Sequence, residues 1–146
     1  MMKLSLMAAF FDTADDEDRY SPIANEIAAR WLGPEADVTH FRSSANFIFS
    51  VVAEKNYFLR FSHESERDLP DIEAALDAIE YLAERGIRVA RPVAAKSGAR
   101  VERVETALGA FHAVLFAGLP GAHRNLDDLH EADFKRWGKA LGKLHV

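Results

Sequence analysis

The 146-residue chain contains no cysteine. This absence excludes disulfide frameworks, thiolate zinc sites and cysteine nucleophiles, and it fits a reducing cytoplasm. No two of its six histidines are separated by three or four residues, the spacing of paired metal ligands on one helix. The sequence therefore predicts no metal site in this chain.

The chain also lacks a run of basic residues and a long apolar run. Its net charge is −5, and its densest acidic cluster lies at residues 15–18, which disfavours binding to nucleic acid or to an anionic membrane. No stretch approaches the roughly 20 apolar residues of a membrane span. The opening letters MMKLSLMAAFF resemble a short signal peptide, but the run is brief and an acidic segment follows, so an amphipathic helix packed on the domain is favoured.

Hydrophobic residues make up 49% of the chain, which is enough to build the core of one domain or of part of one. The first predicted helix is SPIANEIAARWLGP, residues 21–34. Ser21 can cap it, Pro22 fits its first position, and Gly33 with Pro34 ends it.

After this helix the apolar period changes to that of strands. Short connections predict that three strands form an antiparallel meander; they span residues 37–42, 46–53 and 56–62. The third contains the letters NYFLRFS, in which one cation stands among bulky apolar residues. Because side chains alternate along a strand, Arg60 shares a face with Phe58 and not with Leu59.

A helix predicted at residues 69–85 begins after Asp68 and ends at Gly86. Its spacing gives an apolar stripe and an opposite acidic row, so we expect it to pack on the sheet. The stripe consists of Leu69, Ile72, Leu76, Ile79 and Leu82, and the row of Glu73, Asp77, Glu80 and Glu84. Further strands are predicted at 92–95, 101–106 and 110–116, which makes the fold α+β with an antiparallel sheet of about five strands.

The last predicted helix, residues 131–145, has an apolar stripe and no residue that would stop it. The stripe consists of Phe134, Trp137, Leu141 and Leu144. Such a stripe needs something to bury it, so we expect the chain to be the front part of a longer protein or to associate with itself through Phe134 and Trp137.

Three stretches together resemble the N-terminal lobe of the aminoglycoside phosphotransferase family, kinase-like enzymes that act on aminoglycosides, choline, homoserine and related small alcohols. They are SSANFIFSVVAEKNYFLRFS, IEAALDAIEYLAERGIRVARPV and FKRWGKALGKLH. The resemblance implies a helical extension at 1–35, a nucleotide-binding lobe at 36–118, and a hinge with the start of a linker helix at 119–146. It also implies ATP as donor and a small hydroxyl compound as acceptor, in the cytoplasm.

The resemblance places Arg60 at the nucleotide's α- and β-phosphates. It places Ser43, Ser44 and Asn46 in the loop that covers the phosphates with backbone amides and hydroxyls, without a glycine. Without the resemblance, Arg60 can equally be a half-exposed arginine on the sheet surface, and the loop can be an ordinary hairpin turn.

The segment Phe116, Ala117 and Gly118 corresponds to the hinge whose backbone groups recognise adenine. The family's glutamate partner for the third-strand cation falls at Ala75, so Arg60 either pairs with Asp71 or Glu73 or has no carboxylate partner. Glu73 can equally be one of a solvated acidic row.

Phosphoryl transfer further needs a catalytic aspartate and side chains that hold Mg²⁺. The resemblance implies that these lie in a C-terminal lobe beyond residue 146, so no catalytic or metal-binding residue is assigned here and the acceptor cannot be read. The alternative is a non-enzymatic α+β binding module derived from a kinase-like fold.

Overall fold

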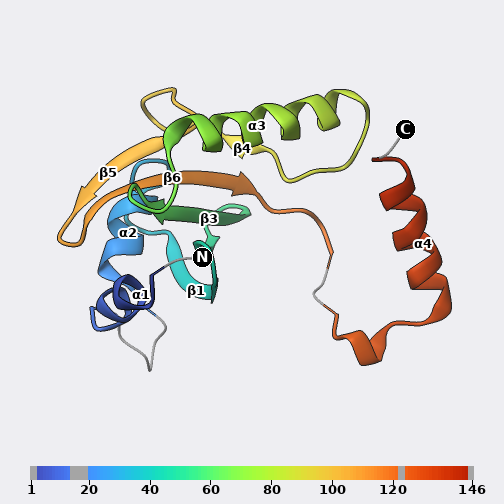
Figure 1. Ribbon diagram of the computed structural model, residues 1–146, viewed down its shortest axis with the longest axis horizontal. Coiled ribbons are helices and arrows are strands. Elements are labelled where there is room, and N and C mark those ends of the chain that lie inside the picture. The colour runs from blue at the N-terminus through green and yellow to red at the C-terminus, as the bar shows by residue number, and fades with distance from the viewer. Residues whose placement is uncertain (1–2, 14–19, 122–123, 145–146) are drawn as a thin grey trace.

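A six-stranded antiparallel sheet forms the centre of the protein, with helices on both of its faces (Figure 1). The computed structural model describes residues 3–13, 20–121 and 124–144. The acidic cluster at 15–18, His123 and His145 lie outside the described residues. The predicted α+β class is confirmed, with one strand more than the five expected.

The first three strands form the predicted meander: β1 (Asp37–Ser43), β2 (Phe47–Val52) and β3 (Asn56–His63). After helix α3 (Leu69–Glu84) come the other three, β4 (Pro92–Val93), β5 (Glu102–Thr106) and β6 (Gly109–Ala117). The strand order is β1-β2-β3-β6-β4, and β5 also pairs with β6. The last strand along the chain therefore lies in the middle of the sheet, a placement that the sequence pattern did not predict.

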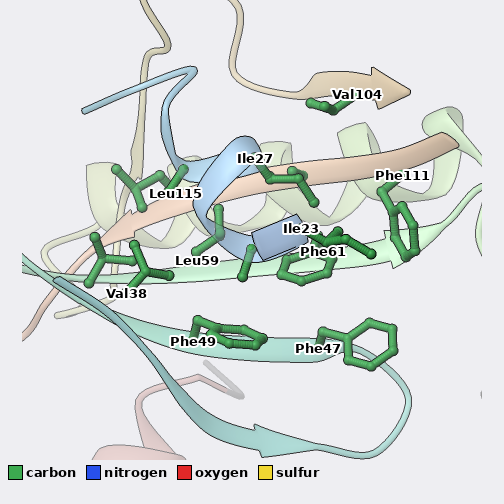
Figure 2. Close-up of a cluster of buried hydrophobic side chains, with 14 of the residues drawn as sticks. Ile23, Ile27, Val38, Phe47, Phe49, Leu59, Phe61, Val104, Phe111 and Leu115 are labelled. Atoms are coloured by element: carbon green, nitrogen blue, oxygen red, sulfur yellow. The ribbon is translucent and has the colours of Figure 1, made fainter. Parts of the chain in front are cut away.

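Helices α1 (Leu4–Phe11) and α2 (Pro22–Ala28) cover one face of the sheet. Phe10 of α1 is fully buried, and its ring stacks on that of Phe47 with the centroids 4.1 Å apart. Figure 2 shows side chains of β2, β3 and β6 gathered with Ile23 and Ile27 of α2 in this cluster. The opening segment is thus a helix that packs on the domain, as favoured from the sequence.

Helix α2 is shorter than predicted because the chain turns after Ala28. The side chain of Trp31 is still buried, and its indole N–H donates to the carbonyl of Val93 at 2.7 Å. The ammonium group of Lys96 donates to the carbonyls of Ala29 and Leu32 and so satisfies acceptors where the helix ends. Contacts with the β4 region therefore replace the expected last turns of the helix.

Helix α3 covers the other face of the sheet, as expected. Asp68 caps it by accepting from the N–H of Asp71 at 3.0 Å. Ile72 and Leu76 are buried against Val114 and Phe116 of β6. Leu69, the first residue of the predicted stripe, is instead exposed in the first turn and does not belong to this cluster.

Beyond β6, a short 3₁₀ helix, η1 (Leu126–Asp128), leads to α4 (Glu131–Gly142). Figure 1 shows α4 standing apart from the sheet. Its apolar stripe is exposed, with 57% of Trp137 accessible to solvent, so nothing in the described part of the chain buries it. Among the helices that the structure describes, none has the length and apolar character to cross a membrane.

We predict that Phe10→Ala lowers the free energy of unfolding by about 3–5 kcal/mol, because it removes a buried ring from the centre of the aromatic cluster. Urea denaturation followed by circular dichroism measures the change. Leu4→Ala, on the same helix at a residue that is 79% exposed, is the matched control and is expected to change stability by less than about 0.5 kcal/mol. Equal midpoints for the two variants would show that α1 does not stabilise the sheet.

Candidate functional site

Arg60 lies on β3, opposite Ile48 on one side and Val114 on the other. Its neighbours Leu59 and Phe61 are buried in the cluster under α1 and α2, whereas Arg60 faces α3. The predicted alternation is therefore confirmed. The guanidinium carbon lies 5.0 Å from the centre of the Phe116 ring, within the range of a cation–π contact.

Burial lowers the pKa of the Arg60 guanidinium below its ordinary value, and the charge of Arg67 lowers it further. A guanidinium nevertheless remains charged at any physiological pH. In the part of the chain that the structure describes, no carboxylate forms an ion pair with Arg60. The site thus holds a half-buried positive charge to which the described residues supply no counter-ion.

An apolar pocket of about 450 Å³ opens beside Arg60 on the α3 face of the sheet. Phe58 and Phe116 supply aromatic surface, and Arg60 is the charged residue at its edge. The other lining residues are Ile48, Ile79, Val89 and Ala90. A pocket of this kind accepts a flat, mostly apolar body on one side and an anionic group at the cation.

A second, smaller cavity adjoins Arg60 in the direction of the β1–β2 turn, and part of its wall is formed by Ser62 and three apolar residues, Phe61, Ile72 and Val114. Asn46, Arg67 and His112 line it together with Arg60. The structure therefore places Asn46 and Arg60 on the same cavity. It also adds Arg67, which the sequence analysis missed because residues 63–68 carry no strand or helix period.

The predicted phosphate loop is a tight turn from β1 to β2, in which the N–H of Ser44 donates to the carbonyl of Asn46 at 3.2 Å. Ser43 is paired with Phe47 and so lies on the face that α1 and α2 cover. Its hydroxyl is 3.0 Å from Nε2 of His40 on that face. The structure consequently does not bring the hydroxyl of Ser43 to Arg60, because strand alternation directs it to the opposite side of the sheet.

The backbone of the predicted hinge is partly engaged within the protein. The N–H of Ala117 donates to the carbonyl of Arg91, and the N–H of Gly118 donates to the carbonyl of Asn56, both at 2.9 Å. These two N–H groups are therefore not free for a base. The side chain of Phe116 reaches the site as a wall of the apolar pocket.

Glu73 is held away from Arg60 by another cation. Its carboxylate contacts the guanidinium of Arg100 at 2.5 Å, and Asp77 and Glu80 contact the same group at 2.8 and 3.3 Å. Hydrogen bonds to Asp77 and Glu73 raise the pKa of Arg100. The acidic row of α3 thus binds the segment that precedes β5 and supplies no partner to Arg60. Among the described residues, no cluster of histidine and carboxylate groups could hold a metal ion.

A model of the phosphotransferase enzyme family (APH) matches residues 37–146. The chain is 25% identical over 122 residues to amicoumacin kinase of Bacillus subtilis (strain 168), and this match covers 82% of the chain and 36% of the kinase. It is 30% identical over 90 residues to the uncharacterized protein sll1119 of Synechocystis sp. (strain ATCC 27184 / PCC 6803 / Kazusa), which covers 62% of the chain and 25% of that protein. The chain therefore spans about a quarter to a third of the length of these relatives.

Two solved structures share the fold. Amicoumacin kinase hAmiN, in complex with AMP-PNP, Ca²⁺ and Ami, matches with a TM-score of 0.64 at 26% identity, covering 87% of this chain and 36% of the kinase. The microcompartment-associated aminopropanol kinase matches with a TM-score of 0.70 at 26% identity, covering 84% of this chain and 39% of that kinase. The resemblance inferred from the sequence is thus confirmed by an independent comparison of the folds.

We predict that Gly118→Ala lowers the free energy of unfolding by about 1–3 kcal/mol, because the new Cβ would come within 2.6 Å of the carbonyl oxygen of Asn56, a backbone atom. The hydrogen bond that joins the hinge to β3 should weaken with it. Urea denaturation measures the change in stability, and amide chemical shifts of Asn56 and Ala117 report the local movement.

Gly33→Ala is the control, since a Cβ there meets nothing within 4 Å. If both variants unfold at the same denaturant concentration, the close approach at Gly118 does not constrain the hinge.

Proposed function

Because the chain belongs to the phosphotransferase enzyme family, we propose that it forms the nucleotide-binding lobe of an enzyme that transfers a phosphoryl group from ATP to a hydroxyl group of a small molecule. The observation that carries this proposal is the half-buried Arg60, which lies between an apolar pocket and a smaller cavity and pairs with no carboxylate in the part of the chain that the structure describes. Such a charge is costly unless a ligand supplies the anion.

In the proposed complex, the adenine ring lies in the apolar pocket against Phe116, and the phosphates extend toward Arg60. The guanidinium fork of Arg60 can donate two parallel hydrogen bonds to phosphate oxygens. The pocket wall and the packing of α3 on the sheet exclude water from one side of these bonds, which strengthens them.

Backbone and amide groups complete the proposed contacts. Asn46 lies on the cavity beside Arg60 and can donate from its side-chain amide, whereas the N–H of Ser44 is engaged by the carbonyl of Asn46 within the turn. At the hinge, the engaged N–H groups of Ala117 and Gly118 leave carbonyl oxygens as the groups available to the amino group of the base.

The catalytic aspartate and the Mg²⁺ ligands are proposed to lie in a second lobe, against which the apolar stripe of α4 would be buried. Bound Mg²⁺ would neutralise charge on the transferred phosphoryl group. The named relatives suggest the kind of acceptor, since aminopropanol is a small amino alcohol. A cytoplasmic location would fit both the use of ATP and the absence of cysteine.

One observation favours a second candidate, a binding module without catalysis. The exposed face of α4, with Phe134 and Trp137, could join two copies of this chain as readily as it could join a second lobe. A module of this kind would be a stable dimer that does not respond to ATP. Sedimentation velocity and nucleotide titration of the same sample separate the two candidates.

We predict that residues 1–146 bind ATP and that Arg60→Gln weakens this binding about tenfold or more, because a charged donor to phosphate is lost. Isothermal titration calorimetry measures the dissociation constants of the two proteins for ATP. Arg30→Gln, which removes the same charge from an exposed position at the end of α2, is the control and should leave them unchanged. Equal ATP affinity of the Arg60 and Arg30 variants would remove Arg60 from the site.

A further inference from the structure

Arg67 lies between the end of β3 and the start of α3, and it lines the same small cavity as Arg60. Asn46, Ser62 and His112 are its other polar lining residues, and Phe61, Ile72 and Val114 are its apolar ones. The cavity has a volume of about 10 Å³, which is room for one oxygen atom of the size of a water molecule. Two cations and an amide donor therefore converge on space for a single acceptor atom.

Neither cation is neutralised by a carboxylate of the described residues. In the described ranges 3–13, 20–121 and 124–144, the side chains of Arg60 and Arg67 form no ion pair. Arg100 contacts three carboxylates and Arg103 contacts two, but other described arginines, such as Arg30 and Arg42, form no ion pair either. What distinguishes Arg60 and Arg67 is that they line one cavity and that burial lowers the pKa of Arg60.

The backbone of Arg67 is held in place on both sides. Its N–H donates to the carbonyl of His63 at 3.3 Å, and its own carbonyl is 3.3 Å from Nδ1 of His112 on β6. Because a carbonyl can only accept, Nδ1 of His112 carries the proton and donates it. The next residue, Asp68, caps α3. These bonds fix the point from which the side chain of Arg67 starts.

Two guanidinium groups that share a partly buried cavity repel each other, and the cost falls when an anion lies between them. The depressed pKa of Arg60 has the charge of Arg67 as one of its causes. A polyphosphate presents several oxygen acceptors in a row, so one of its oxygens can enter the cavity while others remain at its mouth. The apolar pocket on the other side of Arg60 can bind the base of the same ligand.

We propose that Arg67 is a second phosphate-binding cation, and that Arg60 and Arg67 together hold the polyphosphate chain of the ligand. That this ligand is a nucleotide rests on the proposed function. The two-arginine anion site rests on the cavity itself and can be tested without a nucleotide.

The test is isothermal titration calorimetry of residues 1–146 with ATP, with adenosine and with inorganic tripolyphosphate. Arg67→Gln is expected to weaken binding of ATP and tripolyphosphate about tenfold and to leave the affinity for adenosine unchanged. Arg67→Lys, which keeps the charge without the fork, should recover part of the loss. The affinities should also fall less steeply with salt in Arg67→Gln than in the unmodified chain.

Arg30→Gln is again the matched control. Equal affinities of Arg67→Gln and Arg30→Gln for both phosphate ligands would overturn the inference and leave the proposed nucleotide site standing. A loss of adenosine affinity as large as that of ATP, in both Arg67 variants, would also overturn it, because Arg67 would then only support the fold. Tripolyphosphate binding that depends on Arg67, in a chain that does not bind ATP, would support the anion site and reject the proposed function.

Discussion

Burial of aromatic side chains on one face of the sheet is the constraint on which the rest of the structure depends. Phe47 and Phe61, both labelled in Figure 2, stack with their centroids 5.3 Å apart. The ring of Phe10 of α1 contacts both of them. A slip of one residue in the register would expose this whole set. Because the set is fixed to one side, the alternate residue Arg60 is fixed to the other side, where α3 and the candidate site lie.

Charge is distributed unevenly over the α3 face. On the outer side of the helix, three carboxylates surround Arg100 and bind the chain before β5 to α3. At the small cavity, Arg60 and Arg67 form no ion pair with a carboxylate of the described residues. The face therefore contains a neutralised cluster, whose role is structural, and a region of unbalanced positive charge suited to an anionic ligand.

Local features of the sequence were sufficient to predict the face on which Arg60 lies and the position of α3. The period of two in residues 56–62 placed Arg60 on the correct face, and the capping signals at Asp68 and Gly86 located α3 within one residue of its observed end. Less local features were not predictable. The partner of Glu73 is Arg100, 27 positions away, and no period in the sequence links the two.

The sequence alone determined which side chains can share a face, because alternation along a strand and the helical repeat are properties of the backbone. Tertiary structure decided which of these faces meet. It inserted β6 between β3 and β4, directed the hydroxyl of Ser43 away from Arg60, and brought Arg67 to the cavity. The reason is physical: pairing between strands and the closure of loops depend on the packing of the whole core, and a short stretch of sequence does not encode it.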